Sequence, residues 1–302
     1  MSEEARSQKL GVSRSRKLLW CSLAVLLAVA SHRSLAEAQG RAECRTVASA
    51  ILQRNARYCA LLPASYDTEK TRRYAVVYYL HGLGDNEQSL VNSGGWDLVE
   101  QLREQQKIGE FLIITPEGGR TFYVNSLDGK ERYEDFFIKE FIPAMERRYR
   151  ALGTAAARGI GGMSMGGYGA LRFAFKYPRM FASVTAHAAA LFESLPGDAT
   201  ALFGRNFRAF GEPLDSAYWK QNSPFALGRT ANGFGALKIY FDCGLSDDYG
   251  FDAGARQLHE LLEQKKIPHE FHLYPGGHNW QYVAEHFDES LAFHSRALAG
   301  QK

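Results

Sequence analysis

The 302-residue chain lacks several features that mark whole classes of protein. It has four cysteines, too few for a disulfide scaffold, and it lacks the glycine period of collagen. It also has no internal repeat, no low-complexity tract and no Pro/Gly/Ser-rich linker, so a single domain is the simplest expectation. Hydrophobic residues make up 45% and aromatic residues 13% of the chain, which excludes intrinsic disorder. The composition is that of an ordinary globular protein.

Most of the chain also lacks an excess of charge of either sign. The formal net charge is +3, from 36 basic and 33 acidic residues. Residues 1–38 hold six of the basic and three of the acidic residues, so the remaining chain is formally neutral. Nucleic-acid binding and attraction to an anionic membrane both depend on a basic surface. We therefore expect no nucleic-acid partner, and no membrane association once residues 1–38 are removed.

The N-terminal segment has the three parts of an export signal. A basic stretch at 14–17 precedes an apolar run of 13 residues at 18–30, interrupted only by Ser22, and Ala36 and Ala38 supply the small residues before a cleavage site. The alternative is an uncleaved membrane anchor, but the apolar run is shorter than the roughly 18 residues of a spanning helix. The sequence predicts a signal peptide at 1–38 and a secreted or periplasmic domain at 39–302.

Cleavage would leave three cysteines, Cys44, Cys59 and Cys243. The segments 45–51 and 56–62 are rich in β-forming residues and predict an antiparallel hairpin. If its turn lies at 53–55, Cys44 and Cys59 are not opposite each other. We therefore do not expect a bridge between these two residues.

After this hairpin, strand and helix patterns alternate. Short apolar runs, typical of strands buried on both faces, occur at 74–80, 111–115, 156–160, 181–185, 237–241 and 270–274. Amphipathic helical patterns occur at 96–106, 133–149, 166–175, 253–265 and 280–297, with Pro143 expected to bend the second or begin a new turn. The order predicts an α/β fold with a doubly wound, mostly parallel sheet and functional residues at the carboxyl ends of its strands. An aromatic-rich stretch at 188–234 has no clear period and is interpreted as an insertion over the active site.

The strongest motif is Gly-x-Ser-x-Gly at Gly162, Ser164 and Gly166, where a strand gives way to a helix. This is the pattern of a nucleophile elbow, a turn so sharp that a Cβ at either glycine would collide with its neighbours. Ser164 would present its hydroxyl at a helix N-terminus, whose dipole favours developing negative charge. The motif alone is equally compatible with a glycine-rich turn that contains an incidental serine.

A serine nucleophile needs a base and an orienting acid. In a fold of this kind the acid, Asp or Glu, follows the serine along the chain, and the base, His, comes after it. His278 lies on a glycine-rich loop after the strand at 270–274, and the loop after 237–241 carries Asp247 and Asp248. His278 would take the proton of Ser164, and the carboxylate would hold the imidazole and stabilise its cation. We favour Asp247 as the acid, with Asp248 as the alternative.

The oxyanion of the reaction needs hydrogen-bond donors. In this type of site one donor is the N–H of the residue after the nucleophile, here Met165, and the other comes from the loop after an early strand. The segment His81-Gly82-Leu83 occupies that place. We assign the donors as the N–H groups of Leu83 and Met165, and expect His81 to shape the loop by hydrogen bonding rather than to titrate during catalysis.

Several segments together resemble the putative-esterase family of α/β-hydrolases, which includes feruloyl esterases, S-formylglutathione hydrolases and mycolyltransferases. They are LHGLGD at 80–85, RYEDF at 132–136, GMSMGGYGA at 162–170, NSP at 222–224 and GGH at 276–278. The resemblance runs from about Ser49 to the C-terminus. It implies an α/β-hydrolase fold, a Ser-Asp-His triad, a small-molecule ester substrate and no metal or organic cofactor.

The resemblance also bears on individual residues. The family's aspartate follows a Cys-Gly-x-x-Asp pattern that matches Cys243 to Asp247, which favours Asp247 over Asp248. It implies a structural role for the Tyr-Glu-Asp segment at 133–135. At Ala186-His187-Ala188 the sequence departs from the small serine/glycine segment of many relatives. Candidates for the substrate pocket are His81, Tyr123, Asn125, His187 and Trp280.

The resulting hypothesis is a secreted serine carboxylesterase of the feruloyl-esterase type that works through an acyl-enzyme. Within enzymes, the alternatives are an acyltransferase with an alcohol acceptor and a thioesterase of the S-formylglutathione-hydrolase type, against which export argues. A catalytically silent fold that binds carbohydrate or protein is the alternative from another class. Such a fold usually has a broken triad, whereas all the components are present here in order.

Overall fold

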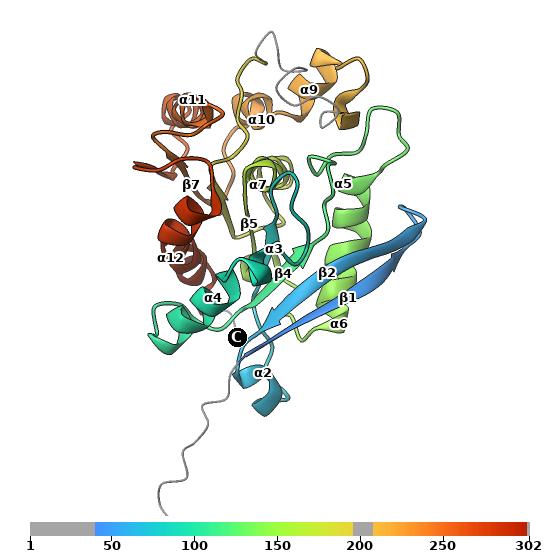
Figure 1. Cartoon of the computed structure of the whole chain (residues 1–302), viewed down its shortest axis with the longest axis vertical. Helices are drawn as coiled ribbons and strands as arrows, with labels where there is room; N and C mark the ends of the chain where they lie inside the picture. The colour runs from blue at the N-terminus through green and yellow to red at the C-terminus, as the bar shows by residue number, and fades with distance from the viewer. Residues whose placement is uncertain (1–39, 196–207, 301–302) are drawn as a thin grey trace, which may run out of the picture. The chain divides into compact units, whose positions relative to one another are not determined.

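The computed structural model describes residues 40–195 and 208–300. The expected signal peptide therefore lies outside the described residues. The described residues form an eight-stranded sheet with the order β1-β2-β4-β3-β5-β6-β7-β8 (Figure 1). β1 and β2 are antiparallel to their neighbours, and β4, β3, β5, β6, β7 and β8 are parallel to one another. The predicted fold, a mostly parallel α/β-hydrolase sheet with an antiparallel N-terminal hairpin, is confirmed.

The strands are β1 Arg41–Ser49, β2 Arg54–Leu62, β3 Val76–Leu80, β4 Leu112–Pro116, β5 Arg158–Met163, β6 Ser183–His187, β7 Lys238–Gly244 and β8 Glu270–Tyr274. The α-helices are α2 Ser65–Thr68, α3 Ser89–Asn92, α4 Gly95–Glu104, α5 Tyr133–Phe136, α6 Ile142–Arg148, α7 Met165–Lys176, α9 Ser216–Asn222, α10 Pro224–Thr230, α11 Phe251–Gln264 and α12 Trp280–Leu298. A π-helical turn, η2 Phe137–Phe141, joins α5 to α6, and a short 3-10 helix, η3 Ala155–Ala157, precedes β5.

Helices cover both faces of the sheet. On one face, α12 packs against β5 and β6 beside α4 (Figure 1). On the other, α7 packs against the same two strands and contacts α10. β3, β4 and β6 are buried along their whole length, which explains their continuous apolar runs. No helix among the described residues combines the length and apolarity needed to cross a bilayer.

Cys44 and Cys59 form a disulfide, so the expectation of no bridge was wrong. The turn spans residues 50–53, and its register places Ser49 opposite Arg54 and Cys44 opposite Cys59. The sequence interpretation placed the turn at 53–55, and that shift moves every cross-strand pair. The third cysteine, Cys243, is buried and free.

The helical segment between residues 133 and 148 is interrupted where Pro143 was expected to act. It widens into the π-helical turn η2, and Pro143 then lies at the start of α6. Proline has no N–H to donate and is tolerated in the first turn of a helix. The described part of the 188–234 stretch forms α9 and α10, and buries Phe210, Trp219 and Phe225. Residues 196–207 are outside the described part, and a cover over the active site stays a prediction.

Candidate active site

Ser164 lies between the end of β5 and the start of α7, in a strained backbone conformation. Its φ is 54° and its ψ is −119°, a region that non-glycine residues rarely adopt and that costs about 1–3 kcal/mol. Its N–H donates to the carbonyl of His187 at 2.9 Å, and its own carbonyl accepts from Ala190 at 3.0 Å. These bonds to the end of β6 and the residues just after it hold the turn in place. The strand–turn–helix expected of a nucleophile elbow is present.

The glycines on either side of Ser164 are needed for space. A Cβ on Gly166 would lie 1.9 Å from the carbonyl oxygen of Leu80, and one on Gly162 would lie 2.5 Å from the same atom. Both distances are well inside van der Waals contact, and the atom belongs to the backbone of β3, which cannot turn aside. The elbow therefore packs directly against the end of β3, the strand that leads into the His81 loop.

His278 and Asp247 complete a chain of hydrogen bonds from Ser164. His278 Nε2 is 2.9 Å from Ser164 Oγ, and His278 Nδ1 is 2.7 Å from Asp247 Oδ2. The other oxygen of Asp247 accepts from the N–H groups of Tyr249 at 2.9 Å and Phe251 at 3.2 Å. With Nδ1 donating to Asp247, Nε2 is free to accept the hydroxyl proton of Ser164. The three predicted residues thus meet at the carboxyl ends of β5, β7 and β8.

The electrostatics keep Asp247 ionised. Burial acts to raise the pKa of its carboxyl, but the hydrogen bond and charge of His278 and the two backbone N–H groups outweigh burial, so the pKa lies below its ordinary value. The alternative acid, Asp248, accepts instead from the backbone N–H of His278 at 3.1 Å. Asp247 therefore contacts the imidazole ring of His278, and Asp248 contacts the backbone of the loop that carries it.

Two residues to which the sequence assigned no role in the site also border the triad. Cys243 Sγ lies 3.6 Å from Asp247 Oδ2, and the ring of Tyr249 meets that of His278 edge-on at 4.8 Å. Tyr249 is 49% exposed, so a molecule that approaches His278 can reach it. Tyr249 lies close in sequence to Asp247, but nothing in its type or spacing indicates which way its ring points.

The loop after β3 is built around His81. His81 Nδ1 lies 2.7 Å from the carbonyl of Gly82, and Nε2 accepts from the N–H of Gly118 at 2.8 Å. The ring is buried, and burial lowers its pKa, so it is the neutral form that joins this loop to the one after β4. The N–H of Leu83 has no acceptor among the described residues, and that of Met165 begins α7, where helical bonding has not started. Both predicted oxyanion donors are therefore available.

A cavity of about 380 Å³ opens beside Ser164. Its wall includes Gly82 and Met163, and a Cβ on Gly82 would lie 3.6 Å from Cβ of Ser164. His81 and Trp280, two of the predicted pocket residues, line it. Trp280 is held there because its Nε1–H donates to the carbonyl of Ser93 at 2.7 Å. Further lining residues are Tyr79, Asp85, Asn86, Ser89, Leu90, Asn92, Ser93 and Thr115.

The other three predicted pocket residues do not line this cavity. Tyr123 is fully buried, and its hydroxyl donates to the carbonyl of His81 at 2.9 Å. Asn125 uses both ends of its amide on Asp135, accepting from the backbone N–H and donating to the carboxylate. The backbone at Tyr123 has a φ of 57°, and its side chain is directed inward against the loop that carries His81. Asn125 instead holds α5 through Asp135.

His187 is also buried, and it belongs to a separate polar cluster. Its Nδ1 is 2.8 Å from Asp242 Oδ2, and its Nε2 is 2.8 Å from Ser290 Oγ. Asp242 also accepts from the hydroxyl of Tyr282 at 2.7 Å. All four residues are buried, so His187 packs within the core and does not contact a substrate. Sequence reading missed the cluster because its members are spread over β6, β7 and α12.

Arg172 joins two segments that resemble the family but contribute no residue to the triad, Tyr-Glu-Asp at 133–135 and Asn-Ser-Pro at 222–224. This buried arginine contacts Glu134 at 2.5 Å and donates from Nε to the amide oxygen of Asn222 at 3.0 Å. Burial acts to raise the pKa of Glu134, but Arg172 and its other partners outweigh it and lower the pKa. Through Arg172, α5 and the end of α9 are both anchored to α7, which agrees with the structural role predicted for the Tyr-Glu-Asp segment.

The chain matches the family model described as putative esterase over residues 49–294. It is 30% identical over 244 residues to an esterase of Mycobacterium tuberculosis, covering 72% of this chain and 51% of the relative. It is 28% identical over 266 residues to an acetyl esterase of Caldicellulosiruptor saccharolyticus, covering 80% and 94%. The chain therefore spans about half the length of the mycobacterial relative.

Among solved structures, a ferulic acid esterase superposes with a TM-score of 0.75 at 25% identity. The alignment covers 86% of this chain and 99% of that one. The fold, the residues around Ser164 and the match over residues 49–294 agree: the chain belongs to the putative-esterase family and has the α/β-hydrolase fold.

Proposed function

We propose that the protein is a serine carboxylesterase in which Ser164 is the nucleophile, His278 the general base and acid, and Asp247 the orienting carboxylate. The observation that carries the proposal is the hydrogen-bond chain from Ser164 Oγ through His278 to Asp247, at 2.9 and 2.7 Å. It begins at a strained serine beside a cavity. Serine, base and acid within hydrogen-bond reach, together with free backbone donors, are the parts that acyl transfer needs.

In the first half of the reaction, Ser164 Oγ attacks the ester carbonyl carbon and its proton passes to His278 Nε2. The N–H groups of Leu83 and Met165 hold the oxyanion of the tetrahedral intermediate. The intermediate collapses, the alcohol leaves with the proton from His278, and an acyl-enzyme remains. Water then attacks the acyl carbon, giving its proton to His278, which returns it to Ser164 as the acid departs. Asp247, kept anionic by its surroundings, stabilises the imidazolium in both halves.

We propose esters of aromatic acids of the ferulate type as substrates. The cavity volume is in the usual range for a small-molecule site. Its wall combines the apolar Leu90, Met163 and Trp280 with polar groups such as Asn86 and Ser93, which suits an aromatic acid that carries hydroxyl groups. The superposition on a ferulic acid esterase supports this choice, whereas the relative named acetyl esterase favours a short acyl group.

A hydrolysis screen separates these substrates. Purified protein is assayed with methyl ferulate, methyl acetate, a siderophore ester and a thioester, with Ser164→Ala as the blank. We expect the highest kcat/KM with methyl ferulate and labelling of the wild type, but not of the variant, by a fluorophosphonate probe. A tenfold or greater preference for acetate would overturn the ferulate proposal and leave the esterase proposal intact. Labelling and turnover that survive in Ser164→Ala would overturn both. Adding a polyol and measuring transferred ester tests the acyltransferase alternative.

We also propose that the protein is exported and that residues 1–38 are removed. The basic and apolar stretches before Ala38 support export, and the Cys44–Cys59 disulfide supports an oxidising compartment. Cell fractionation with N-terminal sequencing tests the proposal. We expect a secreted or periplasmic form that begins at Gln39, and an intact N-terminus in the cytosolic fraction would contradict it.

A further inference from the structure

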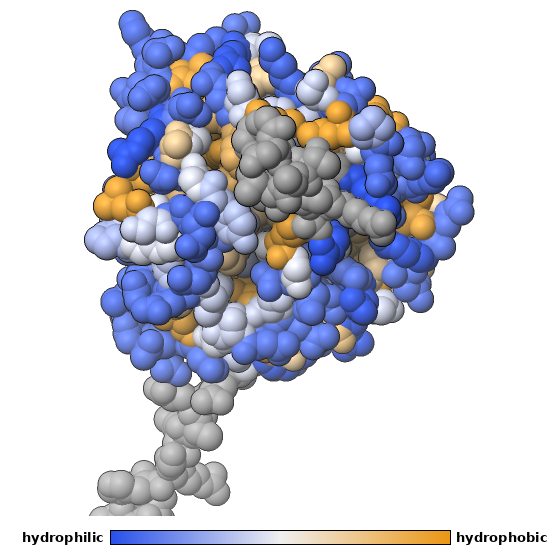
Figure 2. Space-filling view, turned by 45° about the horizontal axis from the view of Figure 1, so that its top comes forward, coloured by the Kyte–Doolittle hydropathy of each residue, from blue (hydrophilic) through white to orange (hydrophobic). Residues whose placement is uncertain are grey.

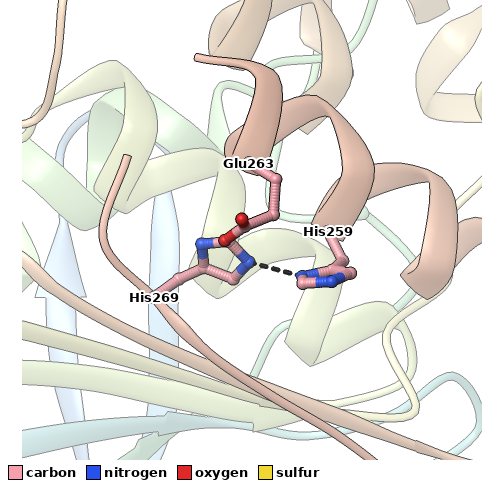
Figure 3. A group of neighbouring side chains, drawn as sticks. All are labelled: His259, Glu263 and His269. Atoms are coloured by element: carbon pink, nitrogen blue, oxygen red, sulfur yellow. Dashed lines mark hydrogen bonds between the residues drawn. The ribbon is translucent and has the colours of Figure 1, made fainter. Parts of the chain in front are cut away.

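A group of side chains with metal-ligand chemistry lies outside the triad, on α11 and the segment that enters β8. His259 and Glu263 are one helical turn apart on α11, and His269 immediately precedes β8 (Figure 3). One ligand atom from each residue lies within 4.8 Å of the others. The three side chains point toward one another, and the dashed line in Figure 3 marks the 2.8 Å contact between His259 Nδ1 and His269 Nε2.

The two imidazoles are held in position before any ligand arrives. His269 Nδ1 lies 2.8 Å from the carbonyl of Ile267, so Nδ1 carries the proton and Nε2 presents its lone pair to His259. This backbone contact to the second ring nitrogen is typical of metal-binding histidines. The His259 ring stacks on Phe271 at 4.7 Å, and the His269 ring stacks on Phe241 at 5.7 Å. Aromatic packing fixes both ring planes, and exposed Glu263 can rotate to meet them.

We propose that His259, Glu263 and His269 bind a divalent ion of the zinc type. Two imidazoles and a carboxylate form a common zinc ligand set, with water as the fourth ligand. The ion would take the place of the proton between His259 Nδ1 and His269 Nε2, and that proton would move to Nε2 of His259 as the neutral ring changes tautomer. Zinc–nitrogen bonds of about 2.0–2.1 Å require these nitrogens to move apart by only about half an ångström.

The location of the site indicates stabilisation rather than catalysis. The Asp247 loop leads into α11, and β8 leads to the His278 loop, so both catalytic loops lie at the opposite ends of these elements from the zinc ligands. A bound ion would join the C-terminal part of α11 to the beginning of β8. We therefore expect zinc to raise the melting temperature and to leave esterase activity nearly unchanged.

The test uses the full chain, purified without a histidine tag and treated with EDTA. Zinc binding is measured by isothermal titration calorimetry, and cobalt is added separately to follow the visible absorption of a tetrahedral site. We expect one equivalent of zinc with a micromolar or lower Kd, and a higher Tm with zinc than with magnesium. Binding weaker than millimolar, or no change in Tm, would overturn the proposal and leave His259 and His269 as a hydrogen-bonded pair.

Three variants locate the ion. Glu263→Gln alters an exposed side chain and is not expected to affect folding, so it provides a test even if His269→Gln fails to fold. We expect the Kd to rise about tenfold or more in Glu263→Gln, as when a supporting metal contact is lost. His286→Gln is the matched control because His286 faces Glu289 on α12 at 4.0 Å without a second histidine ligand. Zinc binding that persists in Glu263→Gln and His269→Gln, or that falls in His286→Gln, places the ion elsewhere and refutes the site.

Discussion

The described part of the chain contains two Asp–His–Ser groups, and their comparison indicates what a reactive group of this kind requires. Asp247, His278 and Ser164 lie at the carboxyl ends of parallel strands beside a cavity. Asp242, His187 and Ser290 lie at similar distances, 2.8 Å and 2.8 Å, entirely within the core, but His187 Nδ1 and Asp242 Oδ2 are not hydrogen-bonded to each other. Residue type and distance are therefore nearly the same in the two groups, but their surroundings differ.

The direction of the hydroxyl proton is the main difference. Ser290 donates its only hydroxyl hydrogen to the carbonyl of Phe287 at 3.0 Å, so in the contact with His187 it must accept. His187 Nε2 then carries a proton and cannot act as a base toward Ser290. Ser164 is 2.9 Å from His278, whose other nitrogen donates to Asp247, so Ser164 can donate its proton. Ser290 also has ordinary helical surroundings in α12, whereas Ser164 lies in a strained turn.

Removing each hydroxyl gives the largest expected contrast. Ser164→Ala should lower kcat by about 10⁴-fold or more, because the nucleophile is lost. Ser290→Ala should leave kcat within about threefold of wild type and lower the free energy of unfolding by about 1–3 kcal/mol, because His187 Nε2 loses its acceptor. Ester hydrolysis and urea unfolding of both variants check this. A loss of kcat in correctly folded Ser290→Ala would show that the two groups are not separate.

The carboxylates can be compared in the same way. Asp247→Asn should lower kcat by up to about 10⁴-fold, since an amide cannot hold the required imidazole tautomer or stabilise its cation. Asp248→Asn keeps an oxygen acceptor for the His278 N–H, and its effect should be less than about tenfold. Steady-state kinetics on the two variants measure the difference. Equal losses would mean that Asp248 shares the role assigned to Asp247.

The buried group should affect stability instead of rate. Asp242→Asn leaves Tyr282 and His187 without a buried charge partner, and we expect a loss of about 3–5 kcal/mol of unfolding free energy. Tyr282→Phe removes one hydrogen bond and is the milder control, at about 1–3 kcal/mol. Denaturant titration gives both values. If folded Asp242→Asn retains wild-type stability, the buried group contributes nothing to the fold.

The pH dependence of stability distinguishes the core from the active site. Burial lowers the pKa of His294 to about 3, so between about pH 3 and 6.5 the unfolded chain takes up a proton that the folded chain refuses. Stability from His294 is complete above pH 6.5 and falls by up to about 1.4 kcal/mol per pH unit below it. Asp247, with a lowered pKa, contributes in the same direction only below about pH 4.

Urea unfolding of wild type and His294→Gln at pH 4.5, 5.5 and 7.5 measures this dependence. His294 hydrogen-bonds Ser183 and Thr185, and the Gln amide can keep part of those contacts. The variant should show a shallower decline of stability between pH 6.5 and 4.5. Parallel curves for the two proteins would mean that His294 titrates normally in the folded state.

Ser164 and His278 could be predicted because each carries a local signal, whereas the choice of Asp247 over Asp248 rested on the family resemblance. Gly162 and Gly166 mark the elbow around Ser164, and Gly276-Gly277 places His278 just after a strand. The prediction for the cysteine pair was wrong for the opposite reason, because the register of a hairpin depends on its turn. Placing that turn two or three residues too late in the sequence put Cys44 and Cys59 out of register, whereas the structure pairs them. The direction of Tyr123, Asn125 and His187 could not be predicted, because it depends on backbone turns and on partners such as Asp242 that are distant in sequence.

The edge strand β1 has a consequence for the behaviour of the protein in concentrated solution. An unpaired sheet edge can recruit a strand from another molecule and begin aggregation. β1 lies at the edge of the sheet and carries Arg41, Glu43 and Arg45, which form ion pairs along it. Cys44, between them, ties this charged strand to β2. The disulfide thus keeps a charged strand paired along the edge of the more apolar β2. If the bond were reduced and β1 detached, β2 would become the exposed edge strand, and other copies of the chain could pair with it more readily.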